Sequence, residues 1–313
     1  MMSALARSSA TPIRRLPGEK PHLSERAKAE RRLGWLLSAP AVAVLLLVAA
    51  YPILNAAYLS LFDYRLTDPG TRAFIWFKNY HVILTDPIWW SDLGTTLFIT
   101  IVTVAGEFAI GFAFAMVMNK TFVGRGFVRT AILVPYAIIT VVAAYAWQYA
   151  FANDTGFVDR WLGTNIDWFG GRWSALFVIC LSEIWKTTPF VALLLLAGLA
   201  QVPGSLQEAA VVDGASWWQR LWRVTLPNMQ GAIMVALLFR TVDAFRIFDN
   251  PFVMTGGSNG TETVSILAYR QTIGRTEIGL GSAMSILLFL GVSLICFIFI
   301  KLLRTDVGRV TNT

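Results

Sequence analysis

The sequence predicts an all-α, polytopic membrane protein with six transmembrane helices. Of its 313 residues, 56% are hydrophobic and only 14% are charged, whereas a soluble domain carries about 25% charged residues. Mean hydropathy is +0.58, and uncharged apolar stretches long enough to cross a bilayer recur along the chain. These observations exclude a disordered chain, a coiled coil and a nucleic-acid-binding domain, and they argue against a soluble enzyme.

The N-terminal segment 1–32 predicts a cytoplasmic basic tail. It holds eight of the 26 Lys and Arg residues, and the following stretch 33–62 has no charge at all. The apolar part of a cleavable signal peptide is only ~7–15 residues long, so we expect 33–62 to be a retained first span. Residues 24–32 predict a short basic amphipathic helix on the inner membrane face.

Six apolar stretches predict the transmembrane domain, 33–303. The predicted spans are 33–62, 93–118, 130–151, 173–200, 229–254 and 280–303. A cytoplasmic C-terminal tail, 304–313, follows them. Four prolines fall inside spans, where they predict local kinks: Pro40, Pro52, Pro135 and Pro189.

The distribution of basic residues predicts that both termini are cytoplasmic. With that orientation the inner segments hold 16 Lys and Arg residues and the outer loops hold seven. Inner loops of membrane proteins are enriched in these residues. The outer loops carry six tryptophans, which fit either an aromatic belt at the membrane interface or a docking surface for an external partner or a sugar.

The predicted cytoplasmic loop 202–228 carries the most specific pattern in the chain. It reads Glu208-Ala209-Ala210, three residues, Gly214, nine residues, Val224, one residue and Leu226-Pro227. The residues before Asp213 favour a helix, and Gly214 can end that helix with a positive φ. Ser216 and Gln219 predict a capping box for a second helix, with an apolar face formed by Trp217, Trp218, Leu221 and Trp222.

This loop resembles the E-A-A-x3-G-x9-I-x-L-P signature of permease subunits in binding-protein-dependent ABC importers, with Val224 where Ile is usual. The resemblance implies the type I importer permease fold and a loop that docks on an ATP-binding subunit. Glu208 would then meet a basic residue of that subunit. The implied coupling residues are Glu208, Ala209, Ala210, Asp213, Gly214, Leu226 and Pro227.

The same resemblance implies the partners. They are a second homologous permease subunit, two copies of a cytoplasmic ATP-binding subunit, an external substrate-binding lipoprotein and the lipid membrane. The sequence has no G-x-x-x-x-G-K-[ST] phosphate loop, so we expect no cofactor in this chain and ATP with Mg on the partner subunits. His22 and His81 have no metal-ligand spacing, and no metal site is expected.

Further stretches resemble carbohydrate-importer permeases, and in particular those of trehalose importers. They are Val134-Pro135-Tyr136, Glu183-Ile184-Trp185-Lys186-Thr187-Thr188-Pro189-Phe190, the run 239–250 that includes Asp243-Ala244-Phe245-Arg246-Ile247-Phe248-Asp249-Asn250, and Thr255-Gly256-Gly257. The resemblance implies a disaccharide substrate, trehalose.

Charged residues inside the predicted spans form a second candidate site. A mid-membrane charge costs about 2.5–3.5 kcal/mol on insertion scales, so these groups face protein or water. Their spacing lets Glu183 pair with Lys186 and predicts a ladder of alternating sign along span five. The candidates are Glu107, Glu183, Lys186, Arg240, Asp243, Arg246, Asp249 and Asn250, with Tyr145, Gln148 and Tyr149 on span three offering aromatic and amide groups to a sugar.

Two roles stay open for these residues. They line a translocation path, or they lock helices together as structural pairs, and the span-three residues fit ordinary helix packing as well as sugar contact. A different class of protein, an ion-coupled secondary transporter, would use intramembrane acids such as Glu107 and Asp243 as proton carriers. The loop signature and the absence of an internal repeat in the sequence argue against it.

Overall fold

The computed structural model describes residues 25–310 except residues 69, 71 and 121. The predicted tail up to residue 24 and the last three residues lie outside this part of the chain. The chain divides into two units, residues 1–54 and 55–313, which are treated separately below.

The described part of the first unit is a long helix, formed by α1 (Glu25–Leu45), a π-helical turn η1 (Leu46–Ala50) and the start of α2 (Tyr51–Leu59). The apolar helical stretch Ala29–Leu59, which begins in this unit and continues past its last residue, has 31 residues and a mean hydropathy of 2.3. Pro52 cannot donate to the carbonyl four residues earlier, and that carbonyl lies inside η1, so the proline accounts for the local change of helix type.

In its described residues the second unit contains four long helices: α4 (Pro87–Asn119), α8 (Arg172–Leu199), α12 (Gln230–Phe245) and α15 (Ile278–Val310). The shorter elements are β1 (Phe62–Asp63), β2 (Ala73–Phe74), α3 (Lys78–Thr85), α5 (Arg125–Ala137), α6 (Thr140–Ala150), α7 (Val158–Leu162), α9 (Gly204–Val212), α10 (Trp217–Arg220), η2 (Leu221–Thr225), α11 (Leu226–Asn228), α13 (Asp249–Thr255), α14 (Val264–Tyr269) and η3 (Arg270–Gly274). The two short strands pair antiparallel, with Phe62 opposite Phe74.

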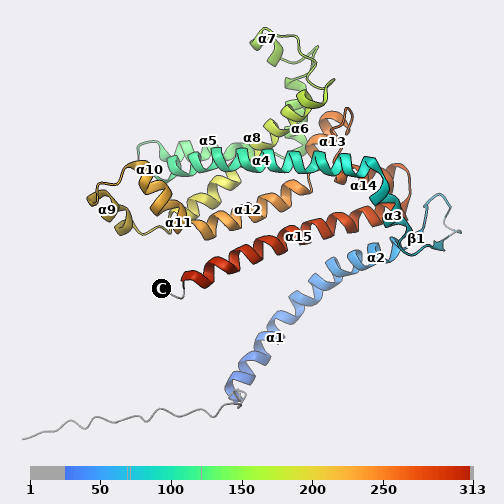
Figure 1. Cartoon of the computed structure of the whole chain (residues 1–313), viewed down its shortest axis with the longest axis horizontal. Helices are drawn as coiled ribbons and strands as arrows, with labels where there is room; N and C mark the ends of the chain where they lie inside the picture. The colour runs from blue at the N-terminus through green and yellow to red at the C-terminus, as the bar shows by residue number, and fades with distance from the viewer. Residues whose placement is uncertain (1–24, 69, 71, 121, 311–313) are drawn as a thin grey trace, which may run out of the picture. The chain divides into compact units, whose positions relative to one another are not determined.

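The long helices place the two ends of the unit far apart. Helices α9, α10 and α11 lie at one end of α4 and α15, while α3, α14 and the strand β1 lie at the other (Figure 1). The loop 202–228 and the segments around α14 are therefore at opposite ends of the unit, as expected if they face opposite sides of a membrane.

Among the described residues, four helices are long and apolar enough to cross a membrane, or five if α5 and α6 count as one broken span. They are the helix over Ala29–Leu59, then α4, α8 and the part of α15 over Ile278–Leu302. Helix α12 has 16 residues, fewer than the ~20 that span a hydrocarbon core. The count of six spans and the inward orientation of both termini stay predictions.

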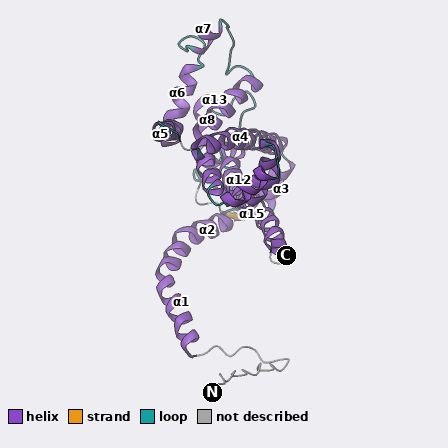
Figure 2. Cartoon of the chain, turned by 90° about the vertical axis from the view of Figure 1, so that its left-hand side faces the viewer, coloured by secondary structure: helices purple, strands orange, loops and turns teal. Residues whose placement is uncertain are grey.

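Two predicted spans are broken. The span 130–151 divides into α5 and α6, which are bent by 92°, because Ile138 and Ile139 adopt extended backbone conformations immediately after the last turn of α5, which contains Pro135. The span 229–254 divides into α12 and α13. Figure 2 shows α6 and α7 projecting away from the long helices.

The pair α4 and α8 forms the framework of the second unit, and α12 packs on both helices. Small residues bring α4 and α8 together. A Cβ atom added at Gly111 would meet the Val191 side chain at 3.1 Å and the Ala192 backbone at 3.3 Å. The close approach buries the facing sides of both helices, and polar groups on those sides must find partners within the protein.

Candidate functional site

The loop 202–228 folds as helix, sharp turn and helix, as its sequence predicts. Two residues after the end of α9, Gly214 has a φ of +75°. This backbone conformation costs other residues free energy. Around Gly214 the amide of Ala215 donates to the carbonyl of Ala210 at 2.9 Å, and Gly214 donates to Val211 at 3.0 Å. These two bonds form a Schellman motif, which fixes the angle at which the chain leaves α9.

The second helix of the loop begins with the predicted capping box. The backbone N–H of Gln219 donates to the Ser216 hydroxyl at 3.3 Å, and the backbone N–H of Ser216 donates to the side-chain oxygen of Gln219 at 2.7 Å. Two backbone donors at the start of α10 are satisfied in this way. The turn is thus held by local bonds and needs no partner to take its shape.

The surface of the loop is exposed where the sequence predicts contact with another subunit. Glu208, Ala209, Asp213 and Gly214 are exposed, as is Pro227, whereas Ala210 and Leu226 are half-buried. The predicted apolar face of the second helix is only partly buried. Leu221 is buried, but Trp217, Trp218 and Trp222 are 49%, 63% and 64% exposed. Exposed apolar patches of this kind mark interaction sites.

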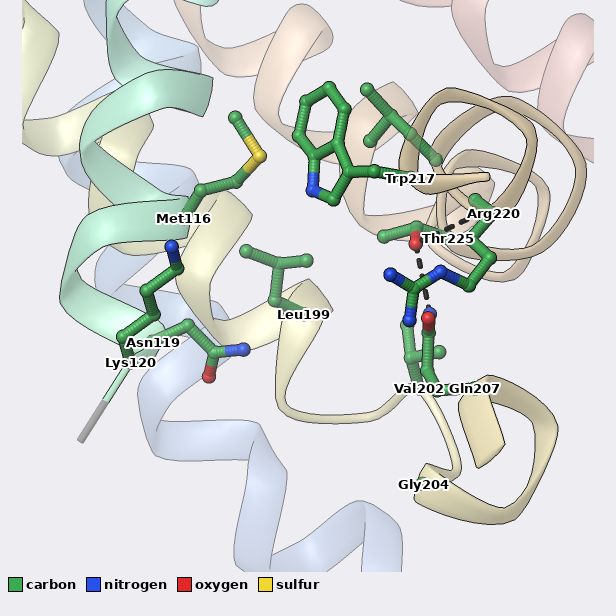
Figure 3. Close-up of a pocket in the computed structure, with 11 residues that line it drawn as sticks. Met116, Asn119, Lys120, Leu199, Val202, Gly204, Gln207, Trp217, Arg220 and Thr225 are labelled. Carbon is green, nitrogen blue, oxygen red and sulfur yellow. Dashed lines mark hydrogen bonds between the residues drawn. The ribbon is translucent and has the colours of Figure 1, made fainter. Parts of the chain in front are cut away.

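A cavity of about 380 Å³ lies between the loop and the ends of α4 and α8 (Figure 3). Gln207 crosses from α9 and donates to the Thr225 hydroxyl at 2.9 Å, and Thr225 donates to the carbonyl of Arg220 at 3.3 Å. These bonds tie α9 to η2, so the two helices of the loop form one unit next to the long helices.

The intramembrane charges form a second, buried cluster centred on Arg240. Its guanidinium donates to both oxygens of Glu107, through Nε and through Nη2 at 2.7 Å. It also donates to Asp243 at 2.5 Å and to Glu183 at 3.4 Å. The side chains of Arg240 and Glu107 are 1% and 0% exposed. The two-pronged contact with Glu107 joins α12 to α4, and the contact with Glu183 adds α8.

Asn250, at the start of α13, joins the cluster. Its amide nitrogen donates to Glu183, and Thr187 donates to Glu107 at 2.6 Å. The other Asn250 atom, Oδ1, is buried and has no hydrogen-bond partner among the described residues. A buried carbonyl oxygen without a donor costs about 1–3 kcal/mol, so this oxygen is suited to accept from a molecule that enters the site.

A polar cavity of about 310 Å³ opens beside the cluster. Its size is at the lower end of ligand cavities in proteins, which are about 300–1,000 Å³. A second cavity of about 380 Å³ shares Tyr136, Thr187, Asp243 and Arg246 with it. The residues that line the polar cavity are Tyr136, Thr140, Glu183, Lys186, Thr187, Asp243, Arg246, Ile247, Phe248, Asp249 and Asn250.

The structure brings together the candidates from spans four and five but changes their partners. Within the described residues no ion pair joins Glu183 to Lys186, because Glu183 is engaged by Arg240 and Asn250. Lys186 instead lies 5.8 Å from the ring centre of Tyr136. The ladder is also incomplete: only Arg240 and Asp243 pair, since the helix ends before Arg246.

The span-three candidates lie elsewhere. Tyr145 and Tyr149 are about three-fifths exposed, at 59% and 60%, and they are outside the polar cavity. Gln148 donates to the carbonyls of Val253 and Met254, at 3.0 and 3.1 Å, which ties α6 to α13. Tyr136 and Thr187 line the cavity although neither carries a charge that marks it in the sequence.

The chain matches the family described as "Binding-protein-dependent transport system inner membrane component" over residues 107–309. It is 53% identical to the trehalose transport system permease protein SugA of Mycobacterium tuberculosis, covering 88% of this chain and 89% of the relative. It is 36% identical to the trehalose/maltose transport system permease protein MalF of Thermococcus litoralis, covering 88% of this chain and 95% of the relative.

Solved structures share the fold. A chain of a bacterial ABC transporter for the import of the acidic polysaccharide alginate superposes with a TM-score of 0.74 over 90% of this chain and 98% of its own length, at 20% identity. A structure of a bacterial alginate ABC transporter in complex with an alginate pentasaccharide-bound periplasmic protein gives a TM-score of 0.75 over 88% of this chain and 96% of its own length, also at 20% identity. At this identity the likeness shows the fold alone.

Proposed function

This chain belongs to the family of binding-protein-dependent transport system inner membrane components, and on that premise we propose that it imports trehalose or a closely similar disaccharide. As a family member it is a multi-pass permease component of an ABC transporter. The observation that carries the substrate proposal is the 53% identity to the trehalose permease over nearly nine-tenths of both chains. In this proposal it forms half of an alternating-access pathway with a second, homologous permease subunit.

The loop 202–228 is proposed to couple this pathway to two ATP-binding subunits, which would bind ATP and Mg. Its support is the exposure of Glu208, Ala209 and the three tryptophans, together with the locally fixed turn at Gly214. A rigid, exposed helix pair next to the ends of α4 and α8 can transmit a displacement of a partner to those helices. An external substrate-binding lipoprotein would deliver the sugar at the opposite end.

The polar cavity is proposed to be part of the sugar pathway. Its lining offers acceptors in Asp249 and in Asn250 Oδ1, donors in Lys186 and Arg246, and the ring of Tyr136. Sugar hydroxyls both donate and accept, so a mixed lining suits them. The deeper pair of Glu107 and Arg240 has its oxygens and guanidinium engaged within the protein, and this pair is assigned the structural role.

The ion-coupled alternative is not favoured. It needs intramembrane acids that bind and release protons, yet Arg240 donates to both of the acids proposed for that role, Glu107 and Asp243. Membership of a family of ABC transporter components supports ATP as the source of energy.

The proposal is tested by uptake of labelled trehalose in cells that lack only this chain, with labelled maltose measured in parallel. We expect trehalose uptake to be lost and to return when the chain is restored. If uptake of another solute is lost while trehalose uptake stays intact, trehalose is rejected as the substrate, but the role of the chain as an importer subunit is retained. Unchanged uptake of every solute would reject the importer as well.

A further inference from the structure

A buried pair of carboxyl groups lies away from both sites, at the end of the second unit opposite the loop 202–228. The segment before α14 crosses the first turns of α4. There the amide of Val264 donates to the Thr96 hydroxyl at 3.0 Å, and the Thr95 hydroxyl lies 3.4 Å from the carbonyl oxygen of Gly260. Residues 260–264 therefore lie against one face of α4.

Each partner in this contact carries a buried acid. Asp92 is one helical turn before Thr95 and Thr96, on the same face of α4, and Glu262 lies between the two contact points of the crossing segment. The residues are 5% and 9% exposed. The oxygens Asp92 Oδ2 and Glu262 Oε1 are both buried and have no hydrogen-bond partner among the described residues. The two carboxylates repel each other electrostatically.

The basic residues around the pair do not satisfy these two oxygens. Arg270, which begins η3, donates to the other oxygen of Glu262, Oε2, at 2.9 Å and to the carbonyl of Gly256 at 2.9 Å. Arg172, from the start of α8, donates to the Thr95 hydroxyl at 3.3 Å. Asp86 adds a further negative charge from the start of α4. Burial raises the pKa of Glu262, although the charges of Arg270 and of Arg275 in the following turn oppose the increase.

Two buried carboxyl groups on contacting segments, each with an unpartnered oxygen, cannot both ionise without a large cost, and one bound proton removes their repulsion. We propose that Asp92 and Glu262 form a proton-binding site, in which the two buried carboxyl groups together hold one proton from solvent. With the proton bound, the segment before α14 stays against α4. Loss of the proton leaves two buried negative charges on the contacting segments and loosens this contact. The site is independent of the proposed substrate.

The pH dependence has a definite sign. A carboxyl group that holds its proton more tightly in the folded protein stabilises the fold at low pH. That stability is lost as pH rises above the ordinary carboxyl value of about 4 and through the higher value in the folded state. The thermal midpoint of the protein is therefore expected to fall between about pH 5 and about pH 8.5.

The test uses the full-length chain, purified from membranes with the subunits that accompany it. Thermal midpoints are measured at both pH values for the wild type, Asp92→Asn, Glu262→Gln and the double variant, with the exposed Asp154→Asn as the control. Asn at position 92 carries no charge at any pH, so Asp92→Asn should lose the pH-dependent drop, expected to be about 3 °C or more in the wild type. The control should keep it. Infrared difference spectra should show a protonated carboxyl band that disappears at high pH and is missing from Asp92→Asn.

Two results would overturn the proposal. If Asp92→Asn and Glu262→Gln keep the wild-type pH dependence and the infrared band, the proton is bound elsewhere. If a chelator lowers the wild-type midpoint at constant pH and leaves Asp92→Asn unchanged, the two carboxyl groups bind a metal ion and not a proton.

Discussion

The loop 202–228 and the cluster around Arg240 represent opposite ways of building a functional region. The loop is exposed and takes its shape from bonds between near neighbours in sequence, the Schellman motif at Gly214 and the capping box at Ser216. The cluster is buried and joins residues 133 apart, such as Glu107 and Arg240. The loop leaves apolar and acidic groups exposed, whereas the cluster satisfies most of its charges internally. A change in the loop should therefore affect coupling, and a change in the cluster should affect the fold.

The largest effect is expected from Arg240→Met. It removes the cation that neutralises Glu107 and Glu183, and breaking a buried ion pair from one side costs about 3–5 kcal/mol. We expect the amount of protein in the membrane to fall severely, measured by quantitative immunoblot. Arg246→Met is the matched control, because Arg246 is exposed and should be dispensable for accumulation. Normal accumulation of Arg240→Met would contradict the structural role of the cluster.

The next largest effect is expected from Gly214→Val, which should reduce uptake and not accumulation. A β-branched residue at φ of +75° costs about 1–3 kcal/mol and changes the angle of the turn. We expect uptake to fall about tenfold or more at unchanged membrane levels, since 1.4 kcal/mol corresponds to a factor of ten. Gly214→Asn should retain more activity, because Asn tolerates this conformation. Gly204→Ala, where an added Cβ meets no atom within 4 Å, should be neutral.

A smaller effect is expected from Asn250→Ala at the polar cavity. The variant removes an acceptor that no described residue uses, and the loss of one hydrogen bond to a substrate is worth about 1 kcal/mol. It also removes the amide that donates to Glu183, so uptake is measured relative to the amount of protein in the membrane. The trehalose concentration for half-maximal uptake should rise about fivefold. Tyr149→Ala is the control, because its exposed ring lies outside the cavity. An equal effect of both variants would remove the cavity from the pathway.

The smallest effect is expected from Ser216→Ala, which deletes one side-chain bond of the capping box. Loss of such a cap costs about 1 kcal/mol, and Gln219 still accepts from the backbone at residue 216. Uptake measured at saturating trehalose should fall by less than half. A complete loss of uptake would mean that the Ser216 hydroxyl contacts the partner directly.

The contrast between local bonds in the loop and long-range contacts in the cluster also explains which features the sequence could predict. The loop follows from its sequence because Gly214, Ser216 and Gln219 act on their neighbours, and the structure confirms the turn and the capping box. The spacing of Glu183 and Lys186 suggested a pair on one helix, but the partners of Glu183 come from α12 and α13. That choice depends on how helices cross, which spacing within one helix does not specify.

The broken spans have the same explanation. Apolar composition predicts a span over 130–151 but does not indicate that Ile138 and Ile139 leave the helix. The break separates α6 from α5 and turns α6 toward α13. Because of this turn, Tyr145 and Tyr149 lie away from the polar cavity, where their aromatic rings were expected to contact a sugar.

In the proposed mechanism, an ATP-binding partner drives sugar transport by moving the exposed loop 202–228. The most direct test purifies the transporter through a tag on this chain, reconstitutes it in lipid vesicles, and measures trehalose uptake and ATP hydrolysis together. The wild type should show both, and Glu208→Lys should accumulate normally and lose both. Trehalose uptake that continues without ATP and follows a proton gradient, or full activity of Glu208→Lys, would contradict the claim.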